Sequence, residues 1–584
     1  MGGFFKSFFA ALLALVVFAV IAVFILAGIV GGLISPKKPD VEAKSVLVID
    51  LAQSLHEQVQ DNPLSGLGSE DQYDVPGVYD LVRLLRYAKG DSAIKGIFLK
   101  CNDDRNGFAT NEEIRNALID FKKGGKFVYA YGDAIPQKAY YVANIADKIY
   151  CSPKGSIDWR GFSVEMTFLK GALQKLDIQP QIFYAGKFKS ATEPLREDRM
   201  TDANRLQLTE LLNDFYNRLL YTTAAARKLD TTVLRKCVNE RLVQRPQDAV
   251  SYGLIDGLRY DDEVKDELRQ RLRIDKHDMI NFIPLGKYAK AVDYKSTGKD
   301  VISLIYAEGD IVDGKGSRDE IGSDTYRWLV RKARFDKDVK AIVIRVNSGG
   351  GSSLASENIW REISLARKEK PVVISFGDVA ASGAYYFSCS ADSVFAMPGT
   401  ITGSIGVFIV VPNMQNFFRD KLGITFDGVK TAPEADALTV TRPLTPFQRK
   451  YLQDNIDSTY LDFKTRVADG RGKSIDYIDS IGQGRVWSGV RGLDLGLVDR
   501  IGTLQDAIDC AARMAKTSNY RLKEYPEPKS FLDQLLGGYK KTMSAKAMKE
   551  QLGEDGYKTW NTIKRVKALV GVSQAKLPFD LTIE

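Results

Sequence analysis

A serine placed where a strand turns into a helix is the residue in this chain best suited to nucleophilic chemistry. Ser382 follows the apolar run of ISFGDVAASGAYYF, and Gly383 behind it lets another backbone approach closely. A serine hydroxyl needs a base, and the chain contains only two histidines. His56 follows an expected first strand and His277 lies in the charged stretch RIDKHDM, so we expect neither to serve. The remaining bases are a lysine that has lost its proton or a carboxylate.

An internal repeat indicates which elements position this serine. KGIFLKCN at 95–102 and KAIVIRVN at 340–347 match at an offset of 245 residues, and the register continues without a gap over some 65 residues. Each copy opens with a β-branched run and then alternates helical and strand patterns. This alternation predicts a mostly parallel sheet flanked by helices, built twice in one chain.

The two copies differ at the positions that could do chemistry. In the second copy the strand IVIRVN opens into SGGGSS, whose bare backbone amides could converge on a developing oxyanion. In the first copy DDRNG replaces the glycine loop, and Gln137-Lys138 replaces Ser382-Gly383. The second copy is therefore predicted to keep a nucleophile and an amide cradle, and the first to keep only the framework. The glycine loop matches neither of the common phosphate-binding patterns, GxGxxG and GxxxxGK(S/T).

Two lysines are candidates for the base. After the aligned core the first copy has FYAGKFKSATEP and the second has FDGVKTAPEAD, which aligns Lys189 with Lys430. Apolar and small residues surround Lys189 on both sides. Such surroundings could exclude water and lower the pKa of the lysine far enough for a general base.

The N-terminal segment carries a long apolar run. Phe8 to Ile34 contains no charge and exceeds the roughly 20 residues that cross a bilayer core. The run ends in GGLISPKKP rather than in a small-residue cleavage site, so residues 1–39 are predicted to be an uncleaved anchor with one span. Lysines flank the run on both sides and leave its orientation open.

Beyond about residue 519 the repeat ends. The tail, 520–584, has the pattern of one or two basic amphipathic helices. We expect it to pack against the second copy or a neighbouring subunit, with a contact to the membrane surface as the alternative.

Composition excludes several other classes of protein. The net charge of +8 is spread over many lysines and arginines without a dense basic block, which favours a solvated surface over nucleic acid binding. The five cysteines are an odd number, widely spaced and without a CxxC pair. They indicate neither a disulfide framework nor a zinc site.

Four motifs, GKFKSATEP, RVNSGGGSSLAS, DVAASGAYY and TITGSIGV, together resemble the signal peptide peptidase family of membrane-anchored serine-lysine proteases, in its long tandem form. The resemblance covers roughly residues 1 to 520. It implies an α/β chain with two ClpP/crotonase-like repeats, at 45–295 and 300–519, and a dyad assembled across them.

By motif position the resemblance assigns a role to each site residue. Ser382 would be the nucleophile, Lys189 the general base and Ser404 the hydroxyl that orients the lysine. The amides of Gly350 and Gly383 would form the oxyanion hole.

The chain departs from the family pattern at two positions. Gly349 stands where the family usually has a proline, which makes the oxyanion loop more flexible. Lys430 stands where the second copy of the long form usually lacks a lysine, and it remains a competitor for the base. Family architecture favours Lys189, because the serine of one repeat meets the lysine of its neighbour.

The resemblance also implies a biological setting. The substrates would be apolar peptides left in the membrane after signal peptidase has cut, and neither a cofactor nor a metal is required. The chain would be a homotetramer in the inner membrane, with its catalytic part in the periplasm. Two rival hypotheses are a non-enzymatic membrane scaffold and an acyl-CoA hydratase-like enzyme, which shares the fold and the amide cradle but does not need Ser382 as a nucleophile.

Overall fold

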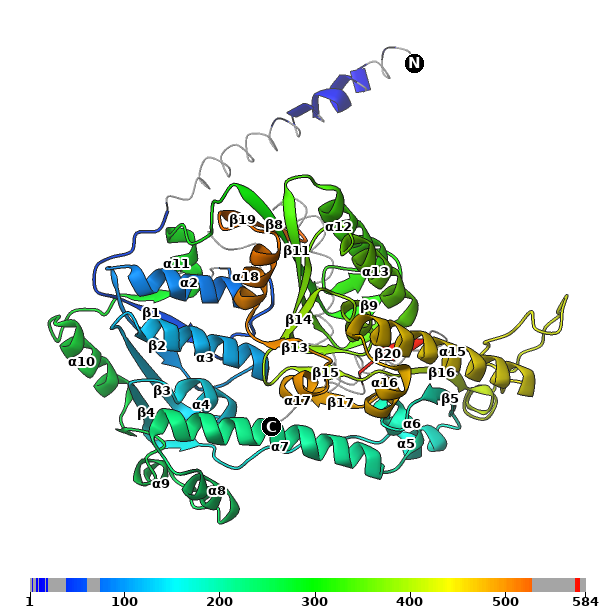
Figure 1. Ribbon diagram of the computed structural model, residues 1–584, viewed down its shortest axis with the longest axis horizontal. Helices are drawn as coiled ribbons and strands as arrows, with labels where there is room; N and C mark the ends of the chain where they lie inside the picture. The colour runs from blue at the N-terminus through cyan, green and yellow to red at the C-terminus, as the bar shows by residue number, and fades with distance from the viewer. Residues whose placement is uncertain are drawn as a thin grey trace.

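The computed structural model describes residues 38–59, 74–527 and 573–577, together with a few positions between 3 and 21. In these ranges the chain forms one sheet in each repeat and a third sheet that joins the two repeats (Figure 1). Helix α7 (Asp202–Arg227) runs beneath both repeats and is capped by Thr201, whose side chain accepts from the amide of Asn204.

The first sheet belongs to the first repeat and is parallel throughout, in the order β6-β4-β3-β2-β1-β7. Its strands are β1 (Ser45–Asp50), β2 (Ile94–Lys100), β3 (Phe127–Ile135), β4 (Lys148–Ile157), β6 (Gly257–Leu258) and β7 (Phe282–Pro284). The helices of this repeat are α2 (Val78–Gly90), α3 (Phe108–Lys122), α4 (Gln137–Ala143), α8 (Thr231–Asn239), α9 (Pro246–Ser251), α10 (Asp261–Leu272) and α11 (Leu285–Ala291). Because helices cover such a sheet, its central strands are nearly continuous apolar runs.

The second sheet has the order β17-β15-β13-β11-β8-β19, with β14 beside β13 and β18 beside β14, and only the β15–β17 pair is antiparallel. Its strands are β8 (Asp300–Glu308), β11 (Val339–Ser348), β13 (Val372–Ala381), β14 (Ser393–Ala396), β15 (Ile401–Gly403), β17 (Val486–Ser488), β18 (Arg500–Ile501) and β19 (Tyr520–Tyr525). Its helices are α12 (Ser323–Phe335), α13 (Ser353–Ala366), α14 (Gly383–Ser388), α15 (Pro446–Arg471), α16 (Ile475–Ile481), α17 (Gly489–Asp494) and α18 (Leu504–Met514), with a π-helical turn at Phe417–Lys421.

Matching elements of the two repeats begin 245 residues apart. Strands β2 and β11 begin at Ile94 and Val339, and strands β3 and β13 begin at Phe127 and Val372. The prediction of a duplicated α/β unit built on parallel sheets is therefore confirmed.

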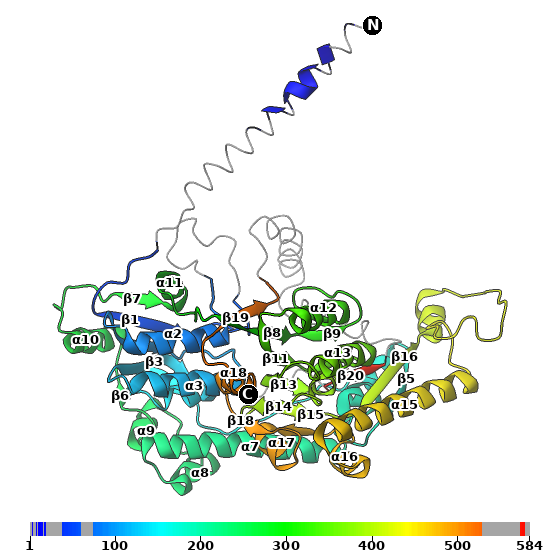
Figure 2. The same ribbon diagram turned by 45° about the horizontal axis from the view of Figure 1, so that its top comes forward.

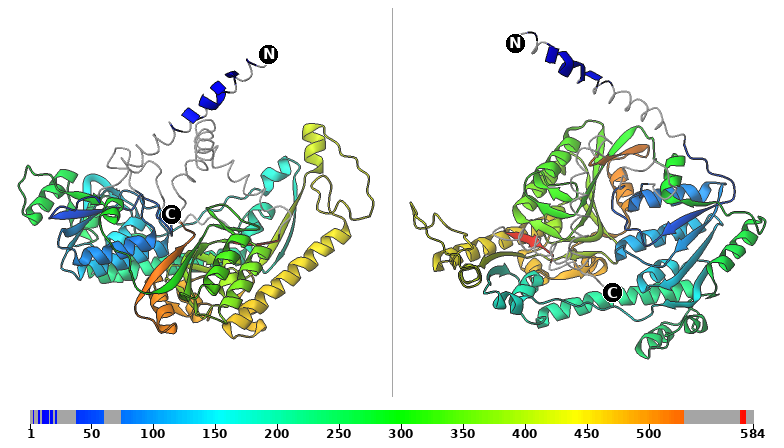
Figure 3. Two further views of the ribbon diagram at one scale, coloured as in Figure 1. Left: turned by 90° about the horizontal axis from the view of Figure 1, so that it is seen from above. Right: turned by 180° about the vertical axis from the view of Figure 1, so that it is seen from behind.

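The third sheet joins the two repeats, in the order β10-β9-β12-β20-β16-β5. Strand β5 (Gln179–Ala185) comes from the first repeat but pairs antiparallel with β16 (Val407–Asn413) of the second (Figures 2 and 3). The other strands are β9 (Asp310–Val312), β10 (Glu320–Gly322), β12 (Gly350–Ser352) and β20 (Gln574–Lys576). The short helices α5 (Lys170–Lys175), Ser190–Thr192 and α6 (Glu193–Arg196) flank β5 in the chain. The segment that carries Lys189 is thus held by the second repeat.

A buried ion cluster fixes the two repeats against each other. Arg345 on β11 is fully buried, and its Nε lies 2.8 Å from Oε2 of Glu57 while its Nη2 lies 2.6 Å from Oε1 of Glu113. Both carboxylates come from the first repeat and are themselves buried. Because a buried charge is strongly destabilising without its partner, this cluster favours one arrangement of the repeats.

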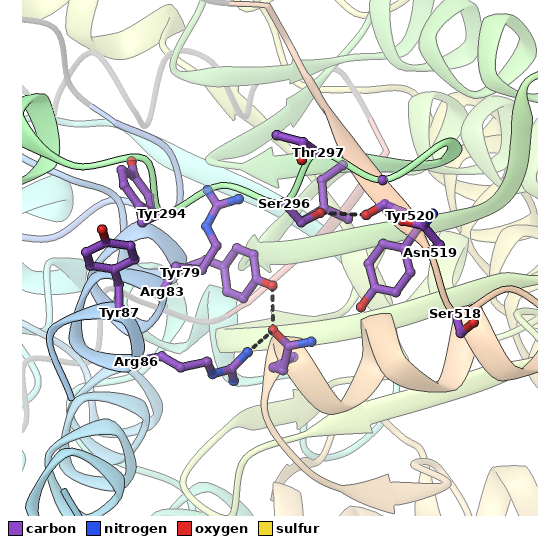
Figure 4. Close-up of a pocket in the computed structure, with 13 residues that line it drawn as sticks. Tyr79, Arg83, Arg86, Tyr87, Tyr294, Ser296, Thr297, Ser518, Asn519 and Tyr520 are labelled. Carbon is purple, nitrogen blue, oxygen red and sulfur yellow. Dashed lines mark hydrogen bonds between the residues drawn. The ribbon is translucent and has the colours of Figure 1, made fainter. Parts of the chain in front are cut away.

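Helix α2 also reaches the second repeat beside a pocket of about 580 Å³. Figure 4 shows tyrosines and arginines of the first repeat facing the end of the second. The hydroxyl of Tyr79 and Nη1 of Arg86 both donate to Oε1 of Gln505, at 2.7 and 2.9 Å. These bonds connect α2 directly to α18.

The predicted membrane anchor, with its span at about 8–34, falls mostly outside the described residues. Among the helices that the structure does describe, none has both the length and the apolar character needed to cross a bilayer.

The predicted helical tail, 520–584, differs from expectation in its described parts. Tyr520–Tyr525 is strand β19 and pairs in parallel with β8, and Gln574–Lys576 is strand β20. The rest of the tail lies outside the described residues. Apolar and charged residues alternate in Tyr-Arg-Leu-Lys, which suits an edge strand. The second sheet therefore extends past residue 519 through β19.

Replacing Arg345 with methionine should lower the free energy of unfolding by about 3 to 5 kcal/mol, because Glu57 and Glu113 would stay buried without their cation. Urea unfolding followed by tryptophan fluorescence measures the change. Lys450→Met, which removes an exposed pair with Asp454, is the matched control and should have little effect. An Arg345→Met protein as stable as the wild type would show that the cluster does not hold the repeats together.

Candidate active site

Ser382 occupies a sharp turn between strand β13 and helix α14. Its backbone has φ 56° and ψ −116°, a conformation that non-glycine residues rarely adopt. The turn is held by hydrogen bonds from the amide of Ser382 to the carbonyl of Gly403 and from the amide of Tyr386 to the carbonyl of Ser382, both 2.8 Å long. A strained strand-to-helix turn of this kind projects a nucleophile from the end of a sheet.

Lys189 is brought to this turn by the pairing of β5 with β16. Ala185, the last residue of β5, lies opposite Val407, and the chain then turns so that Lys189 faces Ser382. The lysine Nζ lies 2.8 Å from Oγ of Ser382 and 3.0 Å from Oγ of Ser404. The structure therefore brings together three residues that the sequence analysis singled out, from two repeats.

Lys189 is fully buried and is surrounded by groups that carry no charge. Its hydrogen-bond partners are two hydroxyls and the carbonyl of Ser404, which is 3.4 Å away. Burial lowers the pKa of the Lys189 ammonium well below its ordinary value, because the charged form loses its hydration and gains no carboxylate in return. Burial therefore favours the uncharged amine.

Ser404 lies directly after strand β15 and, like Ser382, has a positive φ, 51°. Its amide donates to the carbonyl of Arg485 at 2.7 Å, which fixes the turn against the segment before β17. Its hydroxyl contacts the same Nζ of Lys189 that contacts Ser382, so the amine bonds to two serines.

The glycine loop lies beside the nucleophile turn. Gly350 has φ +98°, and a methyl group on its α-carbon would lie 2.8 Å from the amide nitrogen of Gly383. The two glycines that the sequence analysis assigned to the oxyanion hole are therefore neighbours. The amide of Gly350 donates to Oγ of Ser348 at 3.1 Å, so it must exchange this bond before it can stabilise an oxyanion.

Gln207 on α7 holds the lysine segment in place, and the sequence analysis did not identify it. Its Nε2 lies 3.2 Å from the carbonyl of Phe188 and 2.9 Å from Oγ of Ser190, the two residues that flank Lys189. Its Oε1 accepts from the amide of Val486, which lies opposite Gly403 in the β15–β17 pair. A glutamine within a helical pattern gives no local signal of such a long-range contact.

Lys430 lies apart from these residues. It is on the loop before α15, its side chain is 41% exposed, and its Nζ pairs with Oδ1 of Asp436 at 2.6 Å. The positions in the first repeat that match Ser382-Gly383 are Gln137 and Lys138, and Gln137 accepts hydrogen bonds from the amides of Arg160 and Gly161. In the described part of the chain, no group of three or more His, Cys, Asp or Glu side chains is arranged to hold a metal ion.

Comparison with known proteins finds similarity to peptidases in both repeats. The model of peptidase family S49 matches residues 120–275 and 364–518, one segment in each repeat. The chain is 33% identical to Protease 4 of Salmonella typhi over 89% of this chain and 87% of that protein. It is 32% identical to Protease 4 of Haemophilus influenzae, over 77% of this chain and 75% of that protein. It is 32% identical to a putative signal peptide peptidase SppA of Enterococcus faecium, over 36% of this chain and 61% of that protein.

Replacing Lys189 with methionine should raise the thermal unfolding midpoint, and more at about pH 6 than at about pH 9. Unfolding lets the amine bind a proton, so the wild type loses stability as the pH falls from the ordinary lysine pKa toward the lowered one, by up to about 1.4 kcal/mol per pH unit. Methionine has no such penalty. Calorimetry at both pH values measures the difference.

Lys430→Met is the control for this experiment, since it removes an exposed lysine, and its midpoint should change equally little at both pH values. The same gain for Lys189→Met at both pH values would mean that the Lys189 amine keeps its proton in the folded chain.

Proposed function

The chain belongs to peptidase family S49 and is a serine protease, and from this premise we propose that it cleaves peptides with Ser382 as nucleophile and Lys189 as general base. The contact of 2.8 Å between Lys189 Nζ and Ser382 Oγ is the observation that carries the proposal. The lowered pKa of the buried lysine supports it, because only an uncharged amine can accept the serine proton.

The proposed reaction uses these groups in order. Uncharged Lys189 takes the proton of Ser382, and the serine oxygen attacks the carbonyl carbon of the substrate. The lysine then gives its proton to the departing amine, and the acyl group remains on the serine. A water molecule, activated by the same amine, releases the acid and restores the serine.

Three further residues are assigned to supporting roles. Ser404 keeps the amine directed at Ser382, which its 3.0 Å contact with Nζ supports. The amides of Gly350 and Gly383 stabilise the oxyanion of the tetrahedral intermediate, once the Gly350 amide has left Ser348. Such amides typically contribute about 10²- to 10³-fold each to the rate.

The wider proposal follows the resemblance to signal peptide peptidases. We infer that each repeat has a ClpP/crotonase-like fold, that residues 8–34 anchor the chain in the inner membrane and that the catalytic part faces the periplasm as a homotetramer. The substrates would be cleaved signal peptides and other apolar peptides. The name of the Enterococcus faecium relative supports this substrate class.

Ser382→Ala should lower kcat/KM for an apolar peptide by about 10³-fold or more, and Lys189→Arg should do the same because a guanidinium keeps its proton. In the wild type, kcat/KM should fall as the pH falls through the lowered pKa of Lys189, since the amine is then protonated. Peptide hydrolysis measured over a pH series tests both statements.

Lys430→Ala is the matched control for these variants and should change the rate only a few-fold. An inactive Lys430→Ala enzyme beside an active Lys189→Ala enzyme would reverse the assignment of the base. Full activity of Ser382→Ala would instead show that Ser382 is not the nucleophile.

Protease added to intact spheroplasts should digest the body of the chain if it faces the periplasm. Immunoblotting against the second repeat measures the loss, and a cytoplasmic protein serves as the control for leakage. Protection in intact spheroplasts, with digestion only after lysis, would place the chain on the cytoplasmic side and away from the expected substrates.

A further inference from the structure

Glu193 is a fully buried carboxylate that the proposed reaction does not use. It follows Lys189 within the motif GKFKSATEP, and none of its side chain is exposed. A buried carboxylate destabilises the fold unless hydrogen bonds or a cation satisfy it. If Glu193 paired with Lys189, it would favour the ammonium form, and the lysine could not accept a proton. The partners of Glu193 therefore matter for the base.

The hydrogen-bond partners of Glu193 are donors at the N-terminal end of helix α7. Its Oε1 accepts from the hydroxyl of Thr201 at 2.5 Å, and its Oε2 accepts from Nδ2 of Asn204 at 2.8 Å and from the amide of Thr201 at 3.3 Å. Nη2 of Arg196 lies 4.0 Å from Oε1. A helix N-terminus favours negative charge, so this place suits a carboxylate. The lowered pKa of Lys189 agrees with this pairing, because burial is its cause.

Asn204 connects this carboxylate to Gln207, one turn further along α7. Oδ1 of Asn204 accepts from Nε2 of Gln207 at 3.0 Å. The same Nε2 lies 3.2 Å from the carbonyl of Phe188 and 2.9 Å from Oγ of Ser190. Glu193, Asn204 and Gln207 are all buried, so a continuous network leads from the carboxylate to the two residues that flank the lysine. A buried network whose members are satisfied makes the residues that it joins more rigid.

Helix α7 is in turn fixed to the second repeat. Leu211 and Phe215 belong to the apolar cluster that contains Ala381, the residue before the nucleophile. Further along the helix, Oδ2 of Asp214 lies 2.7 Å from Nε of Arg491. The helix therefore has a fixed position relative to the nucleophile turn, and a segment that is bound to the start of the helix shares that position.

We propose that Glu193 is a positioning residue, which keeps the amine of Lys189 at the nucleophile by binding the lysine segment to the N-terminal end of α7. The inference rests on the proposed function, since it takes Lys189 as the base. The described hydrogen bonds of Glu193 reach neither Lys189 nor Ser382, so it acts through the network. Without the network the segment can move, and a displacement of about 1 Å can lower a rate by about 10²-fold.

Glu193→Met tests the proposal, because it removes both acceptors and leaves the donors of Thr201 and Asn204 buried without a partner. We expect kcat to fall about 10- to 100-fold with little change in KM, since no described contact of the network involves the glycine loop. The fall of kcat/KM at low pH should also begin at a higher pH. A lysine that leaves its buried position regains water, so its pKa rises toward the ordinary value.

The pH profile separates positioning from a general loss of structure. A smaller folded fraction would lower the rate equally at every pH and would not move the profile. Glu197→Met is the matched control, since it makes the same change in the same segment at a partly exposed side chain that pairs with Arg196. It should leave kcat and the profile almost unchanged.

The outcomes distinguish this proposal from the proposed function. A Glu193→Met enzyme with the wild-type kcat and pH profile, beside an inactive Lys189→Ala enzyme, would overturn the positioning role and leave the proposed function standing. An equal shift of the profile in Glu197→Met would also overturn the positioning role. An active Lys189→Ala enzyme would overturn both.

A second set of variants does not depend on the folding of Glu193→Met. Asn204→Asp alone places a second carboxylate beside Glu193 and should lower kcat. Adding Glu193→Gln lets the amide at position 193 donate to the carboxylate at position 204, whose other oxygen still accepts from Gln207. The double variant should therefore recover kcat by about 10-fold or more over Asn204→Asp. No recovery would overturn the network, because the two positions would then act independently.

Discussion

The antiparallel pairing of β5 with β16 is the interaction on which the rest of the site depends. It takes a strand out of the first repeat and fixes it, residue by residue, to the second. Beyond the strand, the lysine segment touches the backbone before β17 so closely that a methyl group on Gly186 would lie 2.4 Å from the carbonyl carbon of Gln483. One on Gly484 would lie 2.6 Å from the amide of Lys189. Glycine is required at both positions, because any side chain would move the lysine away from Ser382.

The second constraint is electrostatic. Burial among hydroxyls and carbonyls disfavours the protonated form of Lys189, and this condition also suits a general base. A carboxylate beside Lys189 would favour the charged ammonium, which cannot accept the proton of the serine.

The duplication allowed the two repeats to diverge in opposite directions. In the first repeat the loop that matches the glycine cradle is filled by polar side chains, where Asp104 accepts from Asn106 and Asn111 and burial raises its pKa to about 6. Gln137 satisfies the amides of Arg160 and Gly161 at the position of the lost nucleophile. The first repeat thus keeps its fold without a serine at this position. Because both repeats belong to one covalent chain, each copy of the chain contains both Ser382 and Lys189.

The sequence by itself determined the local features of this protein. The repeat offset, the alternation of strands and helices, and the strand-to-helix turn at Ser382 depend on neighbouring residues, so their patterns can be read directly. The pattern left Lys189 and Lys430 as rivals and gave no sign of Gln207. It also suggested helices where Tyr520–Tyr525 and Gln574–Lys576 form strands. The tertiary structure alone places Lys189 beside Ser382, brings Gln207 to the lysine segment and forms both strands, because each of these contacts joins segments that are far apart in the chain. Strand β20 forms only because β12 and β16 lie on either side of it, and Lys189 reaches a serine 193 residues away only because β5 crosses to the other repeat.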